Sequence, residues 1–154
     1  MSDDITAENI EEYLEKTFPI LYENVYCGIS CPPGWIPIII KLSEDISKIS
    51  EDARVSQIKE KFGAIRFYIS DSTDEIDDLI KKAEKDCLSC CAFCGSKENV
   101  IGLSDTPPNK HGEATGWYIR KCQPCREKSG WTREIEKSYL EKIRKRREQE
   151  EKLG

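Results

Sequence analysis

The chain has 154 residues, of which 38% are hydrophobic and 34% charged, and its formal net charge is -5. This length permits one compact domain with appendages and excludes two large cores. No apolar run approaches the roughly 20 residues of a membrane helix, and the acidic start MSDDITAENIEEYLEK is unlike a secretion signal. We therefore expect a soluble, cytoplasmic protein that does not bind membranes.

Charge changes sign along the sequence. Residues 1–86 contain 19 Asp and Glu against 10 Lys and Arg, a net charge of -9, whereas residues 120–154 contain 7 against 12, a net charge of +5. An acidic body matches a nucleic-acid-binding protein poorly, although the basic tail alone could contact phosphate.

Two amphipathic helices are predicted in the first fifty residues. Thr6 can cap the first helix, whose apolar residues share one face and which ends near Phe18. The second helix has Pro37 in its first turn, and its apolar residues recur at intervals of three and four from Trp35 to Ile49. We expect this stripe to face the core.

After the second helix, the spacing of apolar residues changes from three and four to two. In ARVSQIKEKFGAIRFYIS, apolar and polar residues alternate around Phe62-Gly63, which predicts a β-hairpin. Arg66 and Tyr68, on the other face of this hairpin, could form an exposed binding patch or a second packed layer. Ser72, with a glutamate three residues later, is typical of a capping box and predicts a third helix that ends in the cysteine-rich CLSCCAFCG.

Two Cys-x-x-Cys pairs, Cys91/Cys94 and Cys122/Cys125, are the strongest chemical signal. The 27 residues between them predict a hairpin that returns the chain, so that four thiolates can surround one Zn2+. Gly95 lets the first pair turn so that backbone amides point at sulfur. The second pair begins a predicted helix, whose dipole favours anionic sulfur. These features indicate a treble clef or a zinc ribbon.

The other four cysteines permit more than one interpretation. Cys87 fits the apolar face of the third helix and Cys90 fits its end, which favours packing. Alternatively, both could join Cys27 and Cys31 in a second four-thiolate zinc site, or one of them could compete for the first zinc ion. The sequence thus predicts one Zn2+ and allows a second.

Several segments together resemble a group of small, uncharacterised phage and prophage proteins. They are PPGWIPIIIKLSEDI, KEKFGAIRFY, CAFCG and GWYIRKCQPCREK. The resemblance covers residues 34 to about 128 and comprises a Gly-Trp-led helix, a hairpin and a terminal pair of Cys-x-x-Cys motifs. It implies an origin in a bacterial virus and no particular activity. The first 30 residues, the extra cysteines and the charged tail depart from the pattern.

Two catalytic interpretations fit the residues poorly. His111 and Glu113, followed by the second cysteine pair, suggest a zinc deaminase, but only eight residues separate Glu113 from Cys122, too few for the usual strand and loop. An HNH-type nuclease needs a general-base histidine after the first strand, where this sequence has Asp105. Because four thiolates leave zinc no open position for water, we expect a protein that is not an enzyme.

The tail SGWTREIEKSYLEKIRKRREQEEKLG predicts a capped helix with an apolar stripe and a basic cluster. The stripe comprises Trp131, Ile135, Tyr139 and Ile143. It could lie on its own domain, on a partner or on a second copy of the chain. The basic cluster, a candidate nucleic-acid contact, comprises Arg144, Lys145, Arg146 and Arg147. The glutamates that follow would repel phosphate.

The sequence as a whole predicts an α+β fold that packs as one unit. Residues 1–86 are expected to form an acidic region of helices and a β-hairpin, residues 87–130 a four-cysteine zinc module, and residues 131–154 a charged helix. We expect a phage accessory protein that binds a host or phage protein, with inhibition of a host antiviral defence as one outcome. The alternatives are a nucleic-acid-binding zinc protein that uses its basic tail, and a divergent HNH-type nuclease.

Overall fold

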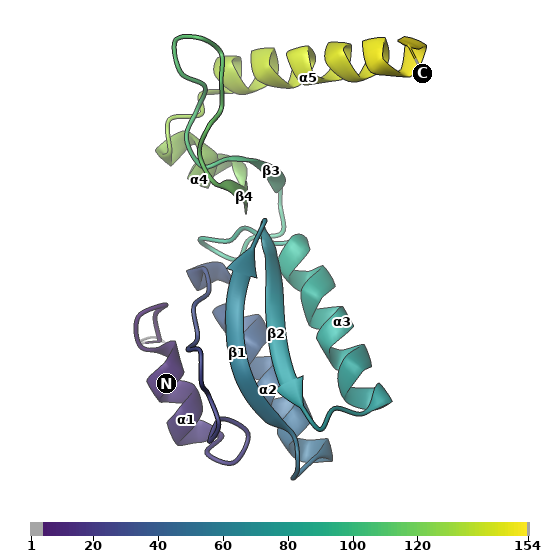
Figure 1. Ribbon diagram of the computed structural model, residues 1–154. Helices are drawn as coiled ribbons and strands as arrows, with labels where there is room; N and C mark the ends of the chain where they lie inside the picture. The colour runs from purple at the N-terminus through teal and green to yellow at the C-terminus, as the bar shows by residue number, and fades with distance from the viewer. Residues whose placement is uncertain (1–4, 154) are drawn as a thin grey trace.

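Two separate β-hairpins, each accompanied by helices, organise the chain. The computed structural model describes residues 5–153 and has an α+β fold (Figure 1). In chain order the elements are α1 (Ile10–Thr17), the 3-10 helix η2 (Pro33–Trp35), α2 (Ile36–Ile49), β1 (Arg54–Lys61), β2 (Ala64–Ser70), α3 (Asp74–Leu88), β3 (Ile101–Ser104), β4 (Tyr118–Lys121), α4 (Gln123–Lys128) and α5 (Arg133–Leu153). Within the described residues, no helix has the length and apolar character needed to span a bilayer.

The main core lies between the β1–β2 hairpin and the helices α2 and α3. Helix α2 lies behind the hairpin and α3 beside β2, and the segment that follows α1 runs between α1 and β1 (Figure 1). The predicted stripe of α2 is confirmed for Trp35, Ile39 and Ile46, which are fully buried, whereas Ile49 in the last turn is exposed. The hairpin contributes Ile58 and Ile65 to the same core. The apolar face of the helix, with a period of 3.6 residues, and the apolar face of the strands, with a period of 2, are therefore buried in the same core.

A buried hydrogen-bond chain anchors the segment that follows α1. The Tyr22 hydroxyl lies 2.5 Å from the Oγ of Ser43, which donates in turn to the carbonyl of Ile39 at 2.8 Å. Tyr22 and Ser43 are both buried, and burial raises the pKa of Tyr22. The tyrosine therefore stays neutral and donates, which satisfies two polar groups inside the core.

Both predicted helix caps are displaced. Thr6 Oγ1 accepts from the backbone amides of Glu8 and Asn9, so it caps a turn that precedes α1. For α3 the cap is Thr73, whose Oγ1 accepts from the amide of Ile76, and not Ser72. Thr73 is the residue with extended backbone angles at the helix start, as a cap requires, so the capping-box prediction was wrong by one residue.

The predicted β1–β2 hairpin is confirmed, with Phe62 and Gly63 as its two-residue turn. Both residues have positive φ, +54° and +79°, as in a type I′ turn. Lys61 pairs with Ala64 across the turn, and a bulge interrupts the ladder near Gln57. The prediction of a strand pair thus holds, and the left-handed conformation at Phe62 is unusual for an aromatic residue.

The part of the chain that follows α3 is called the C-terminal module below. It has few buried apolar side chains and three buried charged ones. Leu103 and Trp131 are buried there beside Lys121, Arg126 and Glu136. Arg126 Nε lies 2.7 Å from the Glu136 carboxylate, which ties α4 to α5. The indole nitrogen of Trp131 donates to a carbonyl of β3 at 2.9 Å. Ion pairs and hydrogen bonds, more than apolar contact, therefore connect the elements of this module.

Helix α5 begins on the module and then projects away from it (Figure 1). The ring of Trp131 meets that of Tyr139 at a centroid distance of 5.3 Å, and Ile135 and Tyr139 line a groove against the loop that contains Pro108. The beginning of the predicted stripe therefore lies on its own domain. Within α5, Glu136 is the one buried residue, so the basic cluster of its second half is in solvent.

Replacing Tyr22 by Phe is expected to lower the free energy of unfolding by about 1 kcal/mol, because one buried hydrogen bond is lost while Ser43 keeps its bond to Ile39. Urea denaturation followed by circular dichroism measures this. Tyr68→Phe, at an exposed position of β2, is the matched control and should change little. Equal stability of the two variants would contradict the anchoring role of Tyr22.

Candidate metal centre

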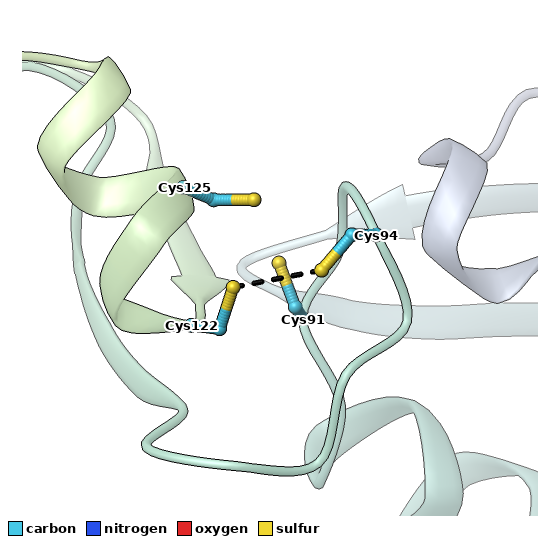
Figure 2. Close-up of side chains that lie close together, drawn as sticks. All are labelled: Cys91, Cys94, Cys122 and Cys125. Carbon is cyan, nitrogen blue, oxygen red and sulfur yellow. Dashed lines mark hydrogen bonds between the residues drawn. The ribbon is translucent and has the colours of Figure 1, made fainter.

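Four cysteine side chains from two distant segments point toward one another (Figure 2). Cys91 and Cys94 lie in the turn after α3, Cys122 is the residue before α4, and Cys125 lies in the first turn of that helix. All four sulfur atoms lie within 4.8 Å of one another, and those of Cys94 and Cys122 are 3.5 Å apart. A tetrahedral ion with bonds of about 2.3 Å separates its sulfurs by about 3.8 Å. The cluster can therefore hold one metal ion.

The turn around the first pair is built as the sequence predicted. Gly95 has a φ of +79°, and its amide donates to the carbonyl of Cys91 at 2.9 Å. The amide of Phe93 points at the Cys91 sulfur over 3.4 Å. Glycine is needed because the chain reverses in the left-handed region, where a side chain is strained. The amide contact compensates negative charge on sulfur.

The β3–β4 hairpin brings the second pair to the first. Ile101 of β3 is paired with Lys121 of β4, the residue immediately before Cys122. The amide of Ala92 donates to the carbonyl of Arg120 at 2.8 Å, which joins the first cysteine pair directly to β4. Two backbone connections thus fix the relative position of the pairs before any metal is considered.

The surroundings of Cys91 lower the pKa of its thiol. Burial of this thiol raises its pKa, but hydrogen bonds from the backbone amides of Phe93, Cys94 and Cys122 outweigh burial and lower the pKa to about 6. Burial raises the pKa of Cys122 and of Cys125. The first ligand is therefore a thiolate at neutral pH, and a bound cation would draw the protons from its neighbours.

Burial is uneven around the cluster. Cys91 and Cys122 are buried, Cys125 is partly buried and Cys94 is exposed. One side of the cluster thus faces the protein, and the Cys94 side is open to solvent.

Gly34 connects the turn that carries Cys91 and Cys94 to the segment just before α2. Its amide donates to the carbonyl of Ala92 at 2.7 Å. A Cβ at this position would lie 2.1 Å from the carbonyl oxygen of Cys91, closer than any real contact. The adjacent Trp35 is fully buried in the main core. The Gly-Trp dipeptide thus connects the main core to the turn that carries two of the four sulfurs.

The remaining cysteines are placed differently. Cys31, Cys87 and Cys90 are buried in the main core, whereas Cys27 is exposed. Burial raises the pKa of Cys31 to about 11 and also raises the pKa of Cys87 and Cys90, so these thiols are protonated. Among residues 5–153, the one group of three or more clustered metal-ligating side chains is the set that contains Cys91. Cys87 and Cys90 therefore pack in the core, which is the interpretation that their positions on and at the end of the third helix favoured.

Neither His111 nor Asp105 belongs to the group of clustered metal-ligating side chains. His111 is exposed in the loop between β3 and β4, where its amide donates to the side chain of Asn109. Asp105 Oδ1 lies 2.5 Å from the ammonium group of Lys121. It therefore takes part in an ion pair beside the cysteine cluster.

Sequence reasoning missed Lys121, which is buried and precedes Cys122 of the cysteine cluster. Its ammonium group also contacts Ser129 Oγ at 2.5 Å and lies 4.5 Å from the ring centroid of Phe93. The cation thus joins β4, the end of α4 and the first cysteine turn. No periodic signal could reveal this, because a lysine in a four-residue strand is normally a solvent-facing residue.

Comparison with known proteins gives no match: none of the family models, curated proteins or solved structures searched is similar to this chain.

Replacing Gly34 by Ala is expected to cost about 2–3 kcal/mol of stability, because the added methyl group meets backbone atoms that cannot rotate away. It should also weaken metal binding, since the turn that carries Cys91 must shift. Thermal unfolding and a competitive metal titration measure the two effects. Pro33→Ala, at the exposed neighbouring position, is the control. Unchanged stability and affinity in Gly34→Ala would refute the connection.

Proposed function

We propose that the chain is a non-enzymatic zinc protein of phage or prophage origin that acts by binding another protein. The observation that carries this proposal is the cluster of four thiols within 4.8 Å. Four cysteines are a typical ligand set for structural Zn2+ and suit a tetrahedral ion. Such a site leaves no position for a water nucleophile, so its contribution is to stability.

The module around the cluster is proposed to be a treble clef. A cysteine turn, an antiparallel hairpin and a helix that begins at the second cysteine pair follow one another in this order. Because few apolar side chains are buried here, the metal would replace a hydrophobic core. Loss of the metal should therefore loosen the module more than the main core.

Exposed aromatic residues support a binding role. The side chains of Tyr26, Phe62 and Trp117 are 77–81% exposed, which is costly for large rings unless they meet a partner. The phage origin rests on the sequence resemblance, and inhibition of a host antiviral defence is the outcome proposed for such a binding protein.

The purified chain is expected to contain one Zn2+, measured by native mass spectrometry. Cys94→Ser should release it and increase hydrogen exchange over residues 91–128, while α2 stays protected because its core is separate. Cys27→Ser, at an exposed thiol outside the cluster, should retain the ion. A metal-free protein with an unchanged fold would disprove the zinc site. Two ions per chain would instead make ligands of Cys27, Cys31, Cys87 and Cys90.

Pull-down from phage-infected or prophage-bearing cells is expected to recover a protein partner that survives nuclease treatment. Phosphate-driven binding falls steeply with salt, whereas an interface with an apolar centre is less sensitive. Tight, strongly salt-dependent binding of DNA or RNA would favour the nucleic-acid alternative. Replacing Arg144, Lys145, Arg146 and Arg147 by Ala should then abolish it, because this cluster is the exposed basic segment of α5.

A further inference from the structure

The outer face of the β1–β2 hairpin is solvent-exposed. Helix α2 lies behind the hairpin, on the face opposite the viewer (Figure 1). Arg66 is exposed on the outer face, and so is Tyr68, at 44%. Of the two interpretations that the sequence left open for this pair, the exposed patch therefore fits the structure, and a second packed layer does not.

Three cation–aromatic pairs lie on this face and at the hairpin tip. The ammonium groups of Lys59 and Lys61 lie 5.7 Å from the ring centroids of Tyr68 and Phe62, respectively. The guanidinium of Arg120 lies 5.3 Å from the ring centroid of Tyr118. We call these residues, together with Arg66, the hairpin-tip patch. Arg120 also donates to the carbonyl of Gly63 at 3.1 Å, so the β4 pair adjoins the turn.

The two lysines and the arginine of the hairpin strands in the patch have no ion-pair partner among the described residues. Lys59 lies directly opposite Arg66 in the strand register. None of the ion pairs found among residues 5–153 includes Lys59, Lys61 or Arg66. Like charges directly opposite each other destabilise a hairpin. Carboxylates from a partner would remove that repulsion.

Phe62 exposes an aromatic ring at an unfavourable backbone position. Its φ is +54° and its side chain is 77% exposed. Asn-Gly is the preferred pair for this turn type, so phenylalanine is neither the best turn residue nor buried. Strain at an exposed position indicates a role for the side chain outside the fold.

From these observations we infer that the hairpin-tip patch binds an acidic segment of a partner protein. Arginine and aromatic residues are typical of the centre of protein interfaces, and the charge of the patch is complementary to carboxylates. This inference rests on the proposed protein-binding function and names the surface and the chemistry of the partner.

Single-stranded nucleic acid fits the patch less well. Binding of that kind stacks bases on free aromatic faces. Here Tyr68, Phe62 and Tyr118 each have a cation of the protein over the ring. A base that stacks on that face would have to displace the cation, whereas a carboxylate can bind the cation where it lies. The net charge of -9 over residues 1–86 also opposes an extended polyanion.

The test uses the full, metal-loaded chain and two fluorescent probes. One is a short peptide of alternating Asp and Glu with a central Leu, and the other is oligo(dT) of similar length. The peptide is expected to bind, and the same peptide with Asn and Gln in place of the acids is not. Lys59→Glu/Arg66→Glu should weaken peptide binding by about tenfold or more, since two attractive charges become repulsive.

Two further variants separate binding from folding. Lys81→Glu/Lys85→Glu reverses two exposed charges on α3 and should leave peptide binding within about twofold. Phe62→Asn should raise the melting temperature, because it creates the favoured Asn-Gly turn, and should nevertheless weaken peptide binding. A merely structural role of Phe62 would not give these opposite changes.

Three results would overturn the inference: no peptide binding, peptide binding unaffected by Lys59→Glu/Arg66→Glu, or preferential binding of oligo(dT) that this variant abolishes. The pull-down keeps these failures distinct from failure of the proposed function. If the reversed variant captures the same nuclease-resistant partner as the native chain, the protein-binding function holds and the assignment of the patch is wrong.

Discussion

Convergence of four thiols at one point is the constraint on which the C-terminal part of this protein depends. The module between α3 and α5 buries few apolar side chains, and buried charges such as Arg126 and Glu136 take much of its interior. Paired charges of this kind contribute little net stability, because desolvation offsets their attraction. A metal ion in the proposed zinc site would therefore be the strongest interaction available to hold the hairpin, the turn and α4 together.

This constraint reaches the main core through one dipeptide. Gly34 packs backbone against backbone on the turn of Cys91, and Trp35 beside it fills the apolar interior. A Cβ at this position would lie 2.1 Å from the carbonyl oxygen of Cys91, so any other residue would force the turn to shift. The connection explains how a small four-cysteine module and a helix–hairpin core pack against each other.

The hairpin-tip patch, which is proposed to bind an acidic partner, lies where the two parts of the molecule adjoin. The β1–β2 turn meets β4 through the hydrogen bond from Arg120 to Gly63, so residues of both parts contribute to the hairpin-tip patch. Strand β4 thus positions Tyr118 and Arg120 next to Gly63, the second residue of the turn. The patch is also basic and aromatic on a protein that is acidic overall, so it would attract an acidic partner that the rest of the surface repels.

The sequence by itself determined the α+β class, the helical stripe of α2, the Phe62-Gly63 turn and the two cysteine pairs, because periodicity, turn chemistry and ligand spacing are local properties. It misplaced the helix caps at Thr6 and Ser72. Asn9 and Thr73 are equally suitable cap residues by type, and only the backbone conformation decides which residue occupies the cap position. Only the tertiary structure decided that Cys87 and Cys90 lie in the main core and outside the cluster, that Lys121 is buried, and that Arg66 and Tyr68 face solvent. These outcomes depend on which faces of distant segments pack together. Local sequence patterns do not specify such contacts.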